Sequence, residues 1–164
     1  MSVELVIATV TLDNGARIGI APMPGRRNPV EVDAARIADW GATLVLSMTM
    51  GEEMPGRASD PLQDALAVRD VAMIHLPIPD WGVPPTGVQL AWPDAAARAH
   101  EVLDARGAIL THCAGGHGRS GMATMRLMTE RGMTPDDALR QIRLVRPGAV
   151  ETADQQSWAA QGYP

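Results

Sequence analysis

The chain of 164 residues has no lysine, no phenylalanine, one tyrosine and one cysteine. A lone cysteine, Cys113, excludes a disulfide within the chain and favours a reducing, cytoplasmic compartment. It also has no second thiol to resolve an oxidised form. Alanine, arginine and glycine are abundant where lysine and phenylalanine are missing, and this bias is consistent with a GC-rich bacterial genome.

Positive net charge and long apolar runs are missing as well. The net charge of −5 argues against a general role on nucleic acid or on an anionic membrane surface. The segment Met1–Val10 has neither the basic start nor the long apolar run of a signal peptide, and no run approaches the length of a membrane span. We therefore expect a soluble monomer with one domain, residues 1–164.

The four histidines and the single cysteine show no ligand spacing of the kind that zinc needs, so we expect neither a metal nor a cofactor. The residues most capable of catalysis instead lie in the sequence THCAGGHGRSG, residues 111–121. Arg119 follows Cys113 after five residues, of which three are glycine. An apolar run leads into this segment, and a run typical of a helix begins at Ser120.

A phosphate group needs residues of these types at this spacing. Glycines let successive backbone N–H groups point inward and form an anion-binding concavity, and a helix N-terminus adds its positive end. The planar fork of Arg119 matches two phosphate oxygens, which lysine cannot copy. The predicted phosphate-binding residues are Ala114, Gly115, Gly116, His117, Gly118 and Arg119.

The same field should stabilise a thiolate at Cys113. A free cysteine, with a pKa of about 8.5, is only a few per cent ionised at neutral pH, and sites of this kind lower that pKa to roughly 3.5–7.5. Ser120 could hydrogen-bond the sulfur and ease its departure in a second step. The alternative is an inert buried cysteine, which is common in proteins.

Residues 112–121 resemble the signature of the cysteine-dependent protein phosphatases, His-Cys-x5-Arg-Ser/Thr-Gly. The segment lies about two-thirds along the chain, as in the dual-specificity group, whereas low-molecular-weight tyrosine phosphatases and arsenate reductases carry it near the N-terminus. The Gly-Gly pair gives a weaker resemblance to phosphatases that act on cyclin-dependent kinases. The resemblance implies that His112 bonds into the loop and tunes the cysteine; the alternative is a core histidine.

A second segment, residues 78–85, reads IPDWGVPP and follows an apolar run. It resembles the family's general-acid loop, Trp-Pro-Asp-x-Gly-Val-Pro, with Ile78 in place of the tryptophan. The resemblance implies that Asp80 is the acid, because a leaving phenolate or alkoxide needs a proton as the P–O bond breaks. The alternative is an ordinary turn, since Pro-Asp-x-Gly is a common turn sequence.

A third segment, Arg146 to Gln155, resembles the family's Arg-Pro-Gly…Thr-x-x-Gln stretch. It implies that Gln155 orients the hydrolytic water. Thr152 and Gln155 also have the spacing of a helix capping box, which is the alternative. We expect Arg146 to brace the catalytic loop from behind. His117 either adds charge at the pocket mouth near pH 6–7 or is simply solvated.

Strand and helix patterns alternate, which predicts an α/β domain with a mixed, centrally parallel sheet whose strand C-terminal edge binds the ligand. Strands are expected at Leu5–Val10, Arg17–Ile20, Thr43–Ser47, Val71–Leu76 and Ala108–Thr111. Three helices are expected in the first part of the chain: from an Asn28 N-cap to Trp40, over Pro61–Arg69 and over Pro93–Arg106. Three more are expected to begin at Ser120 (with a stop at Gly132), at Thr134 and at Thr152. In the helix from Thr134, the side chains of Leu139, Ile142 and Val145 should face the core. Met48–Asp60 is expected to be a mobile loop.

Together these features predict a phosphatase of the dual-specificity type that acts on a phosphorylated protein or a small phosphate monoester through a phosphocysteine. Two alternatives stay open. One is a catalytically weak phosphate-binding module on the same fold. The other is a rhodanese-like sulfurtransferase, which also uses a loop cysteine but needs neither Asp80 nor Gln155.

Overall fold

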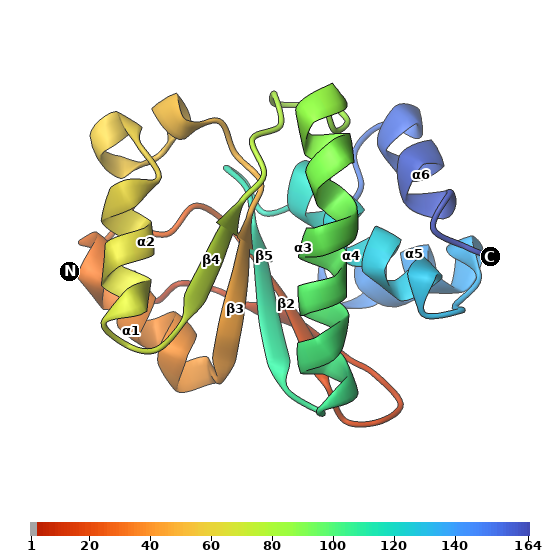
Figure 1. Cartoon of the computed structure of the whole chain (residues 1–164), viewed down its shortest axis with the longest axis horizontal. Coiled ribbons are helices and arrows are strands. Elements are labelled where there is room, and N and C mark those ends of the chain that lie inside the picture. The colour runs from red at the N-terminus through yellow and green to blue at the C-terminus, as the bar shows by residue number, and fades with distance from the viewer. Residues whose placement is uncertain (1–2) are drawn as a thin grey trace.

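A five-stranded sheet lies between two layers of helices in the computed structural model, which describes residues 3–164 (Figure 1). The strands are β1 (Ala8–Thr11), β2 (Arg17–Ala21), β3 (Ala42–Ser47), β4 (Ala72–His75) and β5 (Ala108–His112). Their order is β1-β2-β5-β3-β4, with β1 antiparallel to β2 and the remaining pairs parallel. The predicted α/β fold with a mixed, centrally parallel sheet is confirmed.

The helices divide between the two faces of the sheet. Helices α1 (Val30–Trp40) and α2 (Asp60–Ala67) pack on one face, and α3 (Thr86–Asp104), α4 (Gly118–Glu130), α5 (Pro135–Val145) and α6 (Ala153–Ala160) gather on the other (Figure 1). Successive side chains of β5 point to opposite faces of the sheet and so enter two hydrophobic cores. Ile109 belongs to the core beneath α3–α6, and its neighbour Leu110 belongs to the core beneath α1 and α2. Within residues 3–164 no helix has the length and apolar character to cross a membrane.

The strand ends position the candidate site. The parallel strands β4 and β5 end at the same edge of the sheet, the upper edge in Figure 1. The segment around Asp80 follows β4, and the segment from Cys113 joins β5 to α4. This is the edge at which the sequence predicts a ligand. Residues 1–2 of the predicted domain lie outside the described residues.

Three predicted starts were wrong. The first strand begins at Ala8 rather than Leu5, because its partner β2 is short and Ala8 pairs with the penultimate residue Ile20. The first helix begins at Val30 with Pro29 as its N-cap, since the Asn28 amide instead donates to Val3 O and Asp33 Oδ1 at 2.6 and 2.9 Å.

The third helix begins at Thr86 and runs through Pro93 rather than starting there. A proline inside a helix removes one N–H donor and crowds the carbonyl four residues before it, but the turn before Pro93 is anchored by Val88 and Trp92, which are 4% and 3% exposed. The packing of this face outweighs the missing hydrogen bond.

The other helices lie close to their predicted positions, including the stop at Gly132, where φ is +94°. On α5, Ile142 is fully buried but Val145 is 39% exposed, so the predicted core face is wrong at its last member. Residues 48–60 contain two 3₁₀ helices, Gly51–Glu53 and Pro55–Arg57, and Met54 is buried between them. The mobility of this segment stays a prediction.

Candidate active site

Cys113 stands where β5 ends, and the loop that follows it wraps around the N-terminus of α4. Its side chain is 3% exposed, at the floor of the loop. Ser120 Oγ, from the first turn of α4, lies 3.1 Å from Cys113 Sγ. The hydrogen bond expected between these two side chains is present, and it can stabilise negative charge on the sulfur.

The peptide groups of the catalytic loop, residues 113–119, are oriented with their carbonyls outward. Each carbonyl from residue 114 to 117 accepts a hydrogen bond from a neighbouring segment: Met23 N bonds Ala114 O, Arg146 bonds Gly115 O and Gly116 O, and Gly121 N and Val150 N bond His117 O. In contrast, the N–H groups from residue 114 to 118 have no acceptor within the described part of the chain. Consecutive N–H groups without a protein acceptor are suited to bind an anion or water.

One loop position requires glycine. Gly116 has φ of +72°, and a Cβ there would lie 2.6 Å from Pro22 N and 2.7 Å from Ala21 C. At Gly118 a Cβ would first meet the carboxylate end of Glu151, an exposed side chain that can move aside. Gly115 has no close neighbour, because the nearest atom would be His117 Nδ1 at 3.6 Å. The tight approach of β2 to the catalytic loop therefore explains one of the three glycines.

Arg119 is 1% exposed and is held from three directions. Its Nη1 and Nη2 donate to Glu53 Oε2 and Oε1 at 2.7 and 2.9 Å, in a bidentate pair. Nη1 also donates to Ile78 O at 2.9 Å, and Nη2 lies 3.3 Å from Asp80 Oδ1. Sequence reasoning missed Glu53. Its only signal was a Gly-Glu-Glu sequence in the loop after β3, at the ligand-binding edge of the sheet.

The charges of this cluster support one another. Hydrogen bonding to Arg119 lowers the pKa of Glu53, against the opposing effect of burial, with the Met50 N–H adding to the lowering. Burial acts to lower the pKa of Arg119, but the hydrogen bonds and charge of Glu53, with the charges of Cys113 and Asp80, raise it overall. Both groups are charged at neutral pH, so Glu53 neutralises the buried cation of Arg119.

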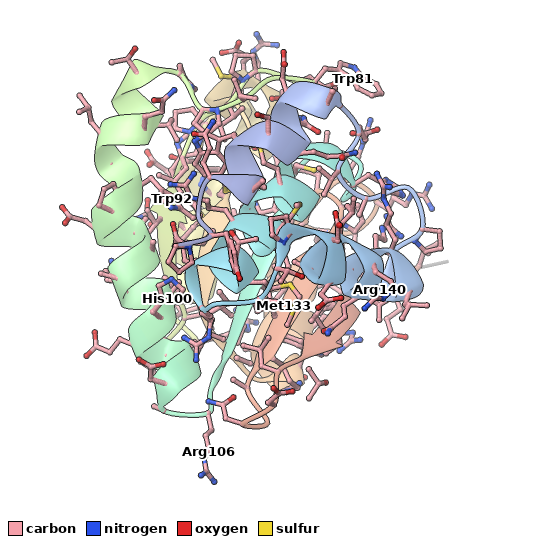
Figure 2. The ribbon with its side chains drawn as sticks, turned by 90° about the vertical axis from the view of Figure 1, so that its right-hand side faces the viewer. Trp81, Trp92, His100, Arg106, Met133 and Arg140 are labelled. Carbon is pink, nitrogen blue, oxygen red and sulfur yellow. The ribbon has the colours of Figure 1, made fainter. Side chains whose placement is uncertain are left out.

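Asp80 lies in an exposed turn above the catalytic loop. Its side chain is 57% exposed and its Oδ1 accepts a hydrogen bond from Trp81 N at 3.0 Å. The turn closes with Gly82 N donating to Pro79 O at 2.9 Å, and Trp81 takes a positive φ of 63° with its ring projecting outward (Figure 2). Ile78, which replaces the tryptophan of the resembled motif, is fully buried and anchors the start of the turn.

Gln155 is fully buried and has two sets of partners. Its Oε1 accepts from Glu151 N and Thr152 N, and Thr152 Oγ1 accepts from Gln155 N, so the predicted capping box is present. Its Nε2 donates to Gly82 O at 3.1 Å, which ties α6 to the turn that holds Asp80. A role in orienting water stays a prediction.

Arg146 braces the loop as expected, with its Nε and Nη2 donating to Gly116 O and Gly115 O at 2.8 and 2.9 Å. His117 precedes α4 as its N-cap residue and is half-buried, and its role at the pocket mouth stays a prediction. Among residues 3–164 no group of three or more His, Cys, Asp or Glu side chains is arranged to hold a metal ion.

His112 is fully buried beneath the loop, and its Nδ1 lies 3.3 Å from Cys113 O. Its Nε2 has no partner among the described residues. Burial lowers the pKa of His112 to about 4, opposed by the hydrogen bond to Cys113 O and assisted by the positive charges of His75 and Arg119. The imidazole is therefore neutral at neutral pH. His112 is a core residue that also contacts the loop at Cys113 O, and its role in tuning the cysteine stays a prediction.

The fold recurs in solved phosphatase structures. Kinase-associated phosphatase, in a form whose catalytic-site cysteine is replaced by serine, is 21% identical with a TM-score of 0.81, over 98% of this chain and 95% of that one. Tk-PTP in the active form is 29% identical with a TM-score of 0.72, over 94% and 95%. PTPMT1 in complex with PI(5)P is 14% identical with a TM-score of 0.75, over 94% of each chain.

A family model described as "Swiss Army Knife protein, DSP-PTPase phosphatase domain" matches residues 22–159. That span contains the acid-bearing turn, the catalytic loop and Gln155, and it covers most of the chain. The resemblance read from the sequence, including the weaker one to kinase-associated phosphatases, is confirmed. The chain belongs to this family of dual-specificity and tyrosine phosphatase domains.

Proposed function

We propose that this phosphatase hydrolyses phosphate monoesters on phosphotyrosine, phosphoserine or phosphothreonine in proteins, through a phosphocysteine intermediate. One observation carries the proposal. The N–H groups of residues 114–118, in the loop that joins Cys113 to Arg119, have no acceptor among the described residues, and Arg119 Nη2 lies 3.3 Å from Asp80 Oδ1. An anion cradle, a nucleophile and a proton donor therefore meet at one place.

In the first step the Cys113 thiolate attacks phosphorus. The P–S bond forms while the P–O bond to the substrate breaks, and the protonated Asp80 gives its proton to the departing oxygen. The loop amides and Arg119 hold the other three phosphoryl oxygens, on which charge is spread in the transition state. Asp80, whose Oδ1 lies 3.3 Å from Arg119 Nη2, turns from the guanidinium toward the leaving oxygen in this step.

In the second step water attacks the phosphocysteine. Asp80, now a carboxylate, takes a proton from the water while the P–S bond breaks and inorganic phosphate leaves. The Ser120 hydroxyl, 3.1 Å from the sulfur, donates a hydrogen bond to the departing thiolate. The enzyme returns to its starting state with no metal or cofactor in the cycle. The domain, we further propose, acts as a cytoplasmic monomer.

Substitution of Asp80 separates hydrolysis from the alternatives. Asp80→Asn should lower kcat by roughly 10²–10⁴, the usual share of a positioned proton donor, with a smaller loss for nitrophenyl phosphate, whose leaving group needs little protonation. Cys113→Ser should abolish turnover and keep phosphate or vanadate binding, because the amides and Arg119 remain. An equal loss across leaving groups would make Asp80 a structural residue instead.

A release screen distinguishes the substrate classes. Phosphopeptides, nucleotides and phosphoinositides are compared for phosphate release, the last because PTPMT1 is seen with PI(5)P. Thiocyanate formation from thiosulfate and cyanide is measured beside it, since a rhodanese-like sulfurtransferase would form it without Asp80. Phosphate binding with no release from any substrate would favour the weak binding module.

A further inference from the structure

The turn that holds Asp80 is fixed at both of its ends. At the start, Ile78 is fully buried and its carbonyl accepts a hydrogen bond from Arg119 Nη1 at 2.9 Å. At the end, the carbonyl of Gly82 accepts one from Gln155 Nε2 at 3.1 Å. Between these points the Asp80 side chain is 57% exposed and lies 3.3 Å from the same guanidinium. Its place beside the catalytic loop therefore depends on how the two ends of the turn are held.

The amide of Gln155 is fully buried, and its partners fix the positions of its oxygen and its nitrogen. Its Oε1 accepts from the N–H groups of Glu151 and Thr152 at 2.9 and 3.3 Å, and its Nε2 donates to Gly82 O. Turning the amide over would set its own N–H groups against the two backbone N–H groups. Because an amide oxygen accepts two hydrogen bonds, both acceptor positions of Gln155 are occupied.

This pattern is unsuited to orienting the water of the second step. That water gives one proton to Asp80 and directs a lone pair at phosphorus, so its second O–H is best held by an acceptor. Gln155 has no free acceptor to offer. Its Nε2 lies beside the start of α4, where a Cβ on Gly118 would be 3.2 Å away. The amide therefore stands between the turn that holds Asp80 and the catalytic loop.

The segment that holds Gln155 also holds the catalytic loop. Val150 N donates to His117 O at 3.0 Å, and Val150 keeps a φ of +62°, which is rare for a β-branched residue. Arg143 donates to the carbonyls of residues 149–150 at 3.0 Å each and so fixes this strained backbone. The next two N–H groups donate to Gln155. A continuous series of hydrogen bonds thus joins the catalytic loop to the turn that holds Asp80.

We propose, on the basis of the proposed function, that Gln155 is a positioning residue for the first step: its Nε2–H holds the turn so that Asp80 reaches the leaving oxygen. Proton transfer requires the donor within about 2.6–3.2 Å of that oxygen, so a small outward displacement of the turn removes the acid from reach. The contact is preorganised, because two backbone N–H groups hold the amide before substrate arrives. Gln155 therefore acts on cleavage of the P–O bond and not on hydrolysis of the phosphocysteine.

Two substitutions remove the donor to Gly82 O. Gln155→Glu keeps an acceptor for the two backbone N–H groups and sets a second acceptor against the Gly82 carbonyl, and Gln155→Met removes all three hydrogen bonds at similar length. For each variant kcat/KM is measured with phenyl phosphate, whose leaving phenolate needs a proton, and with nitrophenyl phosphate, whose leaving group needs little protonation. We expect the ratio of nitrophenyl to phenyl phosphate to rise roughly tenfold, a part of the effect of a positioned proton donor. Because the ratio is taken within one variant, it does not depend on how much of the sample is folded.

Three controls separate this role from the helix cap. Gln156→Met is the matched control, because the Gln156 side chain has no hydrogen bond to any of residues 3–164, and it should leave the ratio unchanged. Thr152→Ala removes the oxygen that accepts from Gln155 N at 3.0 Å, so it should lower Tm but leave the ratio near that of wild type. In an Asp80→Asn background, Gln155→Met should not change the ratio further, because no acid is left to position.

Transient kinetics distinguish the two steps. A residue that orients the hydrolytic water would, when replaced, slow hydrolysis of the phosphocysteine: kcat would fall, kcat/KM would hold, and the initial burst of nitrophenol would grow. If Gln155 instead positions the acid, Gln155→Met should lower kcat/KM for phenyl phosphate and give a burst no larger than that of wild type. The two roles therefore predict opposite changes in the same stopped-flow trace.

Each outcome decides between the ideas. An unchanged ratio in both Gln155 variants, or a rise that persists in the Asp80→Asn background, would overturn the positioning role while leaving the phosphatase intact. An equal rise in Thr152→Ala would assign the effect to the helix cap, and a larger burst in Gln155→Met would assign Gln155 to the water after all. Absence of phosphate release from nitrophenyl phosphate by the wild-type protein would instead refute the proposed function.

Discussion

Replacing Glu53 by glutamine tests whether the carboxylate that holds Arg119 is part of the site. The substitution keeps the size and shape of the side chain and removes its charge. Glutamine can keep one acceptor toward the guanidinium, but its amide nitrogen cannot accept the second hydrogen bond. Wild-type Glu53 makes both, at 2.7 and 2.9 Å, to an arginine that is 1% exposed.

The expected loss of stability follows from that geometry. Hydrogen bonds to charged groups contribute about 1.5–3 kcal/mol each, and one of the two is lost outright. Glu53 is itself 26% exposed, so water compensates in part. We therefore expect Glu53→Gln to lower the free energy of unfolding by about 1–2 kcal/mol, which for a chain of this size corresponds to a Tm lower by roughly 2–8 °C.

The pH dependence gives the sharper readout. The pKa of Glu53 is lowered in the folded state, first by hydrogen bonding to Arg119, so its stabilising effect is complete above the unfolded value of 4.5 and is lost as pH falls through the folded pKa. Urea unfolding from pH 7 down to pH 4 and below should show a constant gap between wild type and variant at neutral pH, which narrows below about pH 4.5.

Glu52→Gln is the matched control for this experiment, because the neighbouring Glu52 is exposed and should show no gap at any pH. A Glu53→Gln variant as stable as wild type at pH 7 would refute the reasoning. So would a gap that stays constant through the acid range, since it would then arise from packing rather than from charge.

Three further predictions concern the loop and its support. His112→Asn should reduce the acid sensitivity of folding, because a histidine whose folded pKa is about 4 costs stability as pH falls from 6.5 toward 4, by up to about 3 kcal/mol; urea unfolding across that range measures it. Gly116→Ala should abolish nitrophenyl phosphate turnover and lower Tm, whereas Gly115→Ala should have a much smaller effect; similar losses in both would contradict the close approach of β2. Arg119→Lys should lose nearly all turnover because it lacks the planar fork, and retention of most of kcat/KM would exclude bidentate phosphate binding.

The catalytic loop could be predicted from sequence because its physics is local. Cys113, Arg119 and the glycines between them lie within the short segment 113–119. The strand before this segment and the helix after it each have a clear sequence pattern. Thr152 and Gln155 form a capping box for the same reason. The role of Asp80 as a proton donor stays a prediction, made because its proline- and glycine-rich surroundings resemble a known loop; the structure places it 3.3 Å from Arg119.

Residues whose partners are distant in the sequence could not be predicted in this way. Glu53 meets Arg119 across 66 positions of sequence, and nothing local distinguishes it from the exposed Glu52 beside it. Asn28 had the pattern of an N-cap, but its side-chain amide donates to Val3 O and Asp33 Oδ1 instead. These partners come from the N-terminal segment and from α1, so the sequence around Asn28 alone does not indicate them. Tertiary partners decided both cases.

The strand order explains why three loops meet at one guanidinium. In the order β5-β3-β4, the parallel strands end together, so the loops after β3, β4 and β5 lie side by side. They supply Glu53, the carbonyl of Ile78 with Asp80, and Arg119 respectively. Each contact alone is a common hydrogen bond or ion pair. Their convergence on a buried arginine couples the shape of the turn that holds Asp80 to that of the loop from Cys113 to Arg119, so a phosphate bound as we propose would act on both segments through Arg119.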